Sequence, residues 1–129
     1  MIDSILTSVK KNLGIEEDYE HFDHDIITHI NSVLATLWQL GVGPETGFSI
    51  SDKSAKWKDF LNDDTLLNLV PTYVYLKVRL IFDPPTTAAV LESFKAEADR
   101  HEWRINVAAE RLKESTEPEV NGIRMENLF

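Results

Sequence analysis

The only stretch whose side chains resemble a set of metal ligands is His21-Phe22-Asp23-His24-Asp25. Two imidazoles and two carboxylates within five residues could hold Zn²⁺ or Mn²⁺. On a helix that starts at His24, however, these side chains point in different directions, and no second cluster elsewhere in the sequence completes a site. With Asp23 as N-cap, Phe22 and Ile27 have the hydrophobic-staple spacing and Asp25 adds negative charge to the first turn. We therefore expect a helix start without a metal or other cofactor, and keep a metal-dependent hydrolase built on His21 and His24 as an alternative.

The remaining signatures of catalysis are weak. Gly41, Gly43 and Gly47 lack the Lys-Ser/Thr ending of a phosphate-binding loop. The serines and histidines do not have the spacing of a nucleophile elbow, and the pair Asp63-Asp64 is better explained as a helix cap. We expect no catalytic residues and no enzymatic activity.

Composition narrows the class of protein further. The 129 residues are 43% hydrophobic and contain no cysteine, which excludes disulfide scaffolds and Cys-ligated zinc and fits one domain with a substantial core. The 13 Lys and Arg against 22 Asp and Glu leave a net charge of −9, which argues against a nucleic-acid reader because phosphates would be repelled. The N-terminus has no basic region typical of a signal peptide, and the most apolar stretch, residues 66–82, is too short and too polar to span a bilayer. The expected location is the cytoplasm, without membrane contact.

Hydrophobic periodicity predicts an all-α fold of about four to five helices. Asp3 can cap a first helix that ends at Gly14, and the second runs from Asp23 to Gly41. Asp52 or Ser54 opens a short third helix. Residues 66–82 have an ambiguous period, but a helix with Pro71 in its first turn is favoured over a strand, and its nearly continuous apolar character predicts a buried central element.

The last and longest helix is expected to begin at a Thr86 or Thr87 cap and to run to about Lys113. Its apolar side is interrupted by His101, while the opposite face carries Glu102 among other charges and pairs such as Lys95 with Asp99. Residues 1–115 then form the helical domain, and 116–129 form a C-terminal tail expected to be flexible in isolation.

The aromatic residues of the helices are most simply explained as core or near-core side chains. These are Trp38, Trp57, Trp103, Tyr73 and Tyr75. Two groups of apolar residues have no obvious place in a core and are candidates for partner binding: Phe48 and Ile50 in the loop 42–51, and Ile123, Met125, Leu128 and Phe129 at the C-terminus.

Several segments resemble, in order, the head-tail connector (adaptor) proteins of tailed bacteriophages. They are Ile5 with Asn12-Leu13-Gly14, then 22–31 (Phe-Asp-His-Asp-Ile-Ile-Thr-His-Ile-Asn), a Gly-rich loop, 73–85 (Tyr-Val-Tyr-Leu-Lys-Val-Arg-Leu-Ile-Phe-Asp-Pro-Pro) and 102–106 (Glu-Trp-Arg-Ile-Asn). The segment from Tyr73 to Pro85, followed by the Trp-Arg helix, is the most specific part. Pro71 departs from the family pattern.

This resemblance implies a non-enzymatic, all-α subunit that assembles into a ring, usually twelve-fold in the particle, beneath the portal vertex. Such a ring extends the DNA channel and supports the stopper or tail-completion proteins, so the expected location is the virion neck, after assembly in the host cytoplasm. It also implies that the segment from Ile123 to Phe129 docks on the portal protein and that the loop 42–51 contacts neighbouring subunits. DNA would pass through without sequence-specific binding. The alternative is a small cytoplasmic regulatory or DNA-binding module, for which the helices lack an obvious basic recognition face.

Overall fold

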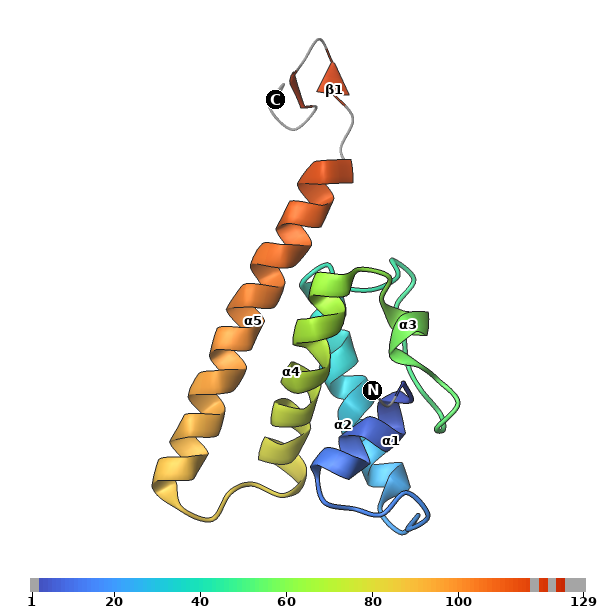
Figure 1. The fold of residues 1–129 in the computed structure, drawn as a ribbon, viewed down its shortest axis with the longest axis vertical. Helices are drawn as coiled ribbons and strands as arrows, with labels where there is room; N and C mark the ends of the chain where they lie inside the picture. The colour runs from blue at the N-terminus through green and yellow to red at the C-terminus, as the bar shows by residue number, and fades with distance from the viewer. Residues whose placement is uncertain (1–2, 117–118, 121–122, 125–129) are drawn as a thin grey trace.

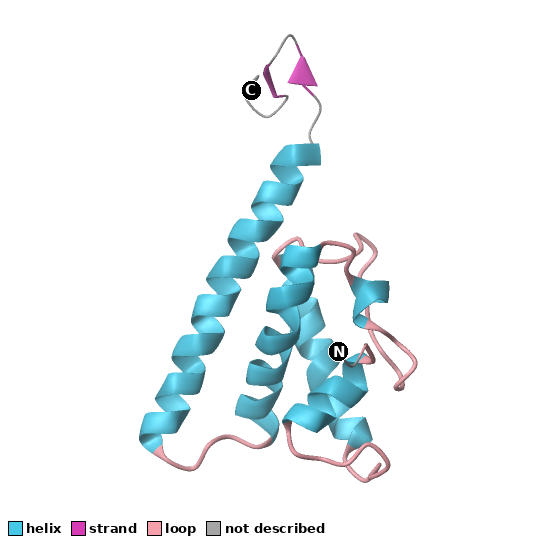
Figure 2. Ribbon diagram, in the orientation of Figure 1, coloured by secondary structure: helices cyan, strands magenta, loops and turns pink. Residues whose placement is uncertain are grey.

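The computed structural model describes residues 3–116, 119–120 and 123–124. Five helices follow one another along the chain (Figure 1): α1 (Ile5–Asn12), α2 (Asp23–Gln39), α3 (Trp57–Phe60), α4 (Asp64–Phe82) and α5 (Ala88–Thr116). Beyond α5, two-residue strands β1 (Glu119–Val120) and β2 (Ile123–Arg124) pair antiparallel (Figure 2). The predicted all-α fold is confirmed, whereas this strand pair was not predicted.

Helix α4 is the centre of the molecule, as its apolar sequence predicted. It packs against α1, α2, α3 and α5, and Val70, Tyr73, Val74 and Val78 are completely buried. Figure 1 shows the resulting order, with α5 on one side of α4 and α1 with α2 on the other. The two sides of the bundle therefore present different elements to the surroundings.

The start of α4 corrects the expected position of Pro71. The Asp63 carboxylate caps the helix by accepting from the Leu66 N–H at 3.0 Å, so Pro71 lies well inside α4 and not in its first turn. Proline cannot donate to the carbonyl four residues earlier, which belongs to Leu67. Both residues are half-buried and line a surface hollow.

Two glycines end helices as predicted. Gly14 and Gly41 have φ of +79° and +84°, a region in which residues with a Cβ are strained. After α1, the N–H of Gly14 donates to Lys11 O and that of Ile15 to Lys10 O; the same pair of bonds follows α2. This is the Schellman arrangement. After α2 it turns Val42 into the core, where it is 1% exposed.

The N-terminal cap of α1 and the start of α3 differ from prediction. Ser4, not Asp3, caps α1 by accepting from the Thr7 N–H. Helix α3 begins only at Trp57, because residues 3–5 pair with the preceding segment: the Ile5 N–H donates to Ala55 O and the Trp57 N–H to Asp3 O. Asp52 and Ser54, which were expected to open the helix, lie instead in the turn before this pairing, where the Asp52 carboxylate accepts from the Ser54 N–H and hydroxyl.

The first turn of α2 corrects the predicted role of Asp23. Phe22 is the N-cap and makes no side-chain cap bond, while Asp23 is the first residue of the helix. Its Oδ1 lies 2.8 Å from Lys10 Nζ, and because this oxygen has no well-directed hydrogen bond, the attraction is that of an ion pair. Phe22 packs edge-on against Phe82 of α4, with ring centroids 5.4 Å apart.

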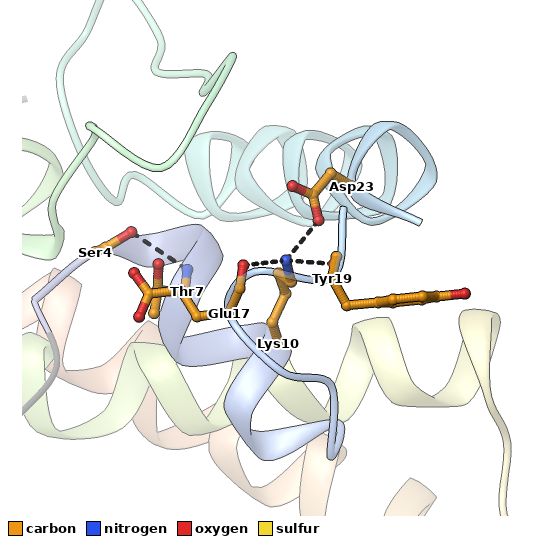
Figure 3. A network of polar contacts seen from close by, with 6 residues as sticks. All are labelled: Ser4, Thr7, Lys10, Glu17, Tyr19 and Asp23. Carbon is orange, nitrogen blue, oxygen red and sulfur yellow. Dashed lines mark hydrogen bonds and ion pairs between the residues drawn. The ribbon is translucent and has the colours of Figure 1, made fainter. Parts of the chain in front are cut away.

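The ammonium group of Lys10 joins α1, α2 and the loop between them (Figure 3). Lys10 is only 2% exposed. Besides the ion pair with Asp23, its Nζ donates to the carbonyls of Glu17 at 2.9 Å and Tyr19 at 2.8 Å. Two of its protons therefore have carbonyl acceptors, and the Asp23 carboxylate balances its charge, as a buried lysine requires.

The seam between α4 and α5 contains a polar contact that the sequence placed wrongly. Glu102 was assigned to the outer face of α5, but its Oε1 accepts from the hydroxyl of buried Tyr73 at 2.7 Å. Burial raises the pKa of the Tyr73 hydroxyl well above its ordinary value, and the hydrogen bond to the Glu102 carboxylate raises it further.

The exposed cation Lys95 pairs with Glu92 at 3.7 Å instead of the predicted Asp99.

The tryptophans divide between core and surface. Trp57 and Tyr73 are buried as predicted, and Tyr75 is half-buried. Trp38 and Trp103, in contrast, are 51% and 68% exposed, so their assignment to the core was wrong. Trp38 lies on the last turn of α2, where its indole N–H donates to Glu45 O at 2.9 Å.

Among the described residues, no helix has the length and apolar character needed to cross a membrane.

Replacing Lys10 by Met should lower the free energy of unfolding by about 2–4 kcal/mol, because two carbonyls and the Asp23 carboxylate lose their donor. Urea denaturation followed by circular dichroism measures this change. The adjacent Lys11 is exposed, so Lys11→Met is the matched control and should stay within about 0.5 kcal/mol of the wild type. Equal effects of the two substitutions would contradict the role given to Lys10.

Tyr73→Phe should lower the free energy of unfolding by about 1–2 kcal/mol at pH 7, because the hydrogen bond to Glu102 is lost. The pKa of Tyr73 is raised in the folded state, so its contribution is complete below the unfolded pKa of about 10 and declines as pH rises past it. The variant should therefore lose less stability than the wild type between pH 8 and pH 11. Exposed Tyr19 offers the control substitution Tyr19→Phe, which should keep the wild-type alkaline decline.

Candidate interaction surfaces

The loop between α1 and α2 forms an acidic surface. Six acidic residues and no basic one lie between Glu16 and Asp25, and the side chains of Glu16, Glu17, Asp18 and Glu20 are exposed. Such a run of like charges repels itself, and the contacts of Lys10 with the carbonyls of Glu17 and Tyr19 hold it in one shape. Lys10 thus turns a self-repelling loop into a defined acidic surface.

This loop borders a surface hollow of about 650 Å³ that we call the acidic hollow. Leu6 of α1 and Ile27 of α2 contribute apolar side chains to its lining. Two lysines also line the hollow. Lys10 is held by the contacts described above, and Lys53 takes no part in them. The carboxylates that line it belong to Glu16, Glu17, Asp18, Glu20, Asp23 and Asp52. The acidic hollow therefore combines a partly apolar lining with a strongly negative rim.

The outer side of α5 forms a second surface, which we call the Trp103 face and define as Trp103, Arg100, Arg104 and Arg111. All four side chains are exposed. Spacings of four and seven residues place the three arginines along one side of the helix, beside Trp103. Arg100 hydrogen-bonds to Glu97, which holds the pKa of that carboxyl below its usual range. This grouping was not predicted from the sequence, because the acidic residues of α5 balance the total charge of the helix.

The residues of the possible metal cluster do not converge. Asp23 is engaged by Lys10, and His21 packs its ring against Phe22 with centroids 4.8 Å apart. His24 and Asp25 are exposed. Within the part of the chain that the structure describes, no three His, Asp or Glu side chains group as metal ligands. The arrangement gives the hydrolase alternative no support.

The predicted partner-binding residues of the loop 42–51 pack within their own subunit. Ile50 is 5% exposed and belongs to the core, and its backbone is held by both polar atoms of the Asn31 side chain. Phe48 is half-buried and stacks on Phe60, with ring centroids 5.1 Å apart. Their apolar character therefore has an explanation inside the fold, and Phe48 is the more accessible of the two.

The predicted tail residues are described only in part. Ile123 belongs to β2 and pairs with Val120 of β1. Met125, Leu128 and Phe129 lie outside the described residues. The tail follows directly from α5, which runs to Thr116, a little beyond the predicted Lys113.

Further apolar side chains are exposed that the sequence did not single out. Tyr19 in the acidic loop is 49% exposed, and Ile81 and Val90 flank the turn between α4 and α5. Residues 84–90 contain no charge, which is the signal in the sequence that could have identified this turn as an uncharged end of the bundle. The end of the bundle near this turn lies opposite the end from which the C-terminal segment leaves (Figure 1).

Comparison with known proteins gives one match. A family model described as phage connector protein matches residues 5–112, which begins with α1 and continues through most of α5. Neither the search of curated proteins nor that of solved structures found a match. The family match covers far more than half of the sequence, and on this basis the chain belongs to the phage connector protein family.

Proposed function

We propose that this chain is the subunit of a head-tail connector ring that lies beneath the portal, extends the DNA channel and supports the stopper or tail-completion protein. The observation that carries the proposal is the family match over residues 5–112. Membership in this family implies a structural role and a place in the virion neck. Twelve subunits, as in rings below a portal, are the expected number.

The charge of the chain supports a conduit for DNA. A net charge of −9 disfavours tight contact with phosphates, and a channel through which DNA slides must not hold it. The three arginines of the Trp103 face are the main basic group on α5, and acidic Glu97, Asp99 and Glu110 accompany them. We propose that DNA passes without sequence-specific binding.

The C-terminal segment is the proposed contact with the portal. It leaves the bundle from the end of the longest helix and lies beyond the matched residues 5–112, so it is a part in which individual members can fit their own partner. Burial of apolar side chains against a partner is favourable, and this segment contains four of them: Ile123, Met125, Leu128 and Phe129. The loop 42–51, with Phe48 as its more accessible apolar residue, is proposed as a contact between neighbours.

Mass photometry of the purified chain with and without its portal protein tests the proposed function. Ring assembly on the portal should add a mass equal to a whole multiple of the 14.7 kDa subunit, about twelve subunits if the expected symmetry holds. A stable dimer that does not bind the portal protein and that retards a DNA duplex in a gel would contradict the proposal and favour the DNA-binding module.

Deleting residues 117–129 should abolish binding to the portal while helical content and thermal stability stay unchanged, because all five helices end before the deletion. Pull-down on immobilised portal protein measures the loss. A full-length variant with Ile123, Met125, Leu128 and Phe129 all replaced by Ser separates apolar burial from chain length, and it should bind as poorly as the deletion. Undiminished portal binding by either variant would exclude the segment as the docking element.

A further inference from the structure

We propose that the Trp103 face of one subunit docks into the acidic hollow of the next, and that this contact joins neighbours in the ring. The inference rests on the proposed ring function and names its interface. Its occupant is a second copy of this chain.

The Trp103 face has the composition of an interface anchor. Trp103 is 68% exposed, and within the described residues no hydrogen bond or ring contact engages it. Tryptophan and arginine are the residue types most enriched among those that dominate binding energy. Arg100, Arg104 and Arg111 lie together to one side of it on α5, a helix that packs against α4.

The acidic hollow offers the complementary features. Its apolar contributors Leu6 and Ile27 suit an indole ring, and the carboxylates around them suit guanidinium groups. Six carboxylates against the two lysines Lys10 and Lys53 leave the lining with a net negative charge. Acidic side chains beside apolar ones complement a tryptophan beside arginines.

The placement of the two surfaces determines the kind of assembly. Helix α5 lies on one side of α4, and α1 with the acidic loop lies on the other (Figure 1). Because α5 and the acidic loop lie on opposite sides of α4, a two-fold dimer cannot seat both Trp103 faces in acidic hollows at once. Attraction requires unlike surfaces on successive copies, which is a head-to-tail contact that can close into a ring.

The net charge of −9 is consistent with this pairing. Subunits of this charge repel one another at long range, and contacts between positive and negative groups reduce that repulsion where they meet. Salt screens both the attraction at the contact and the repulsion between whole subunits, so charge reversal at the contact tests the interface more directly than a change of ionic strength.

Reciprocal charge reversal tests the interface. One variant carries Arg104→Glu with Arg111→Glu, and the other carries Glu16→Lys with Glu20→Lys; all four residues are exposed. Each variant alone should lower the fraction of portal bound to a complete ring by about tenfold or more, because the arginine variant brings two carboxylates to the acidic hollow and the glutamate variant removes the net negative charge of the hollow. An equimolar mixture should restore rings in which the two variants alternate, since wild-type pairs and reversed pairs of charges then follow one another around the ring.

A matched control shows that position matters and not total charge. Lys58→Glu with Lys95→Glu changes the net charge by the same amount as the arginine variant, on exposed sites outside both surfaces, and should assemble like the wild type. Circular dichroism melting confirms that each variant folds. The size of the ring is read by mass photometry on the portal complex.

The outcomes separate the interface from the function. Normal rings from both charge-reversed variants would overturn the interface and leave the connector function intact. A wild-type chain that forms no ring with its portal would overturn the proposed function and the interface with it. Normal rings from the arginine variant, together with loss of a DNA affinity that the wild type has, would overturn the interface in favour of a nucleic-acid surface on α5.

Discussion

The buried ammonium group of Lys10 is the constraint on which the N-terminal half of the molecule depends. It bonds two carbonyls of the loop and the first carboxylate of α2, so one side chain ties together three segments that would otherwise separate. The cost of burying its charge is offset only while all three acceptors are in place. The geometry of the loop and the orientation of α2 against α1 are therefore linked. The hydrogen bonds from Lys10 to the carbonyls of Glu17 and Tyr19 hold the acidic surface of this loop in one conformation.

Periodicity and capping residues predicted most of the fold, and the misses have physical causes. The positions of α2, α4 and α5 follow from apolar spacing, and Gly14 and Gly41 end their helices as expected. The role of Asp23 could not be predicted, because its partner Lys10 lies thirteen residues earlier and a local pattern offers only a cap. Trp103 was misplaced for a related reason: amphipathicity ranks a large aromatic as core, whereas the helix turns it away from α4. The order of helices also supported the family resemblance, which the match over residues 5–112 confirms.

The distribution of charge links this fold to its proposed work. The total of −9 is concentrated in the loop after α1 and in the C-terminal segment, while α5 is nearly balanced but places its arginines on one side. A subunit with a negative surface on one side of the bundle and a positive surface on the other can bind its neighbours head to tail until a ring closes. Such a ring does not require a strong contact between any two subunits, because many contacts act together. In the proposed ring, many modest contacts would add up to a stable assembly, and an acidic wall would not hold DNA tightly.

The most direct test of this account is covalent trapping of the proposed contact on the portal. The chain contains no cysteine, so a variant with Arg104→Cys and Asp18→Cys carries only the two introduced thiols, one on α5 and one in the loop between α1 and α2. Mild oxidation of the portal-bound protein should give a ladder of disulfide-linked multimers that ends at the number of subunits in the ring, and each single-cysteine variant should give no ladder. Absence of linked multimers from a fully assembled ring would contradict the head-to-tail contact, and a product that stops at the dimer would contradict it as well.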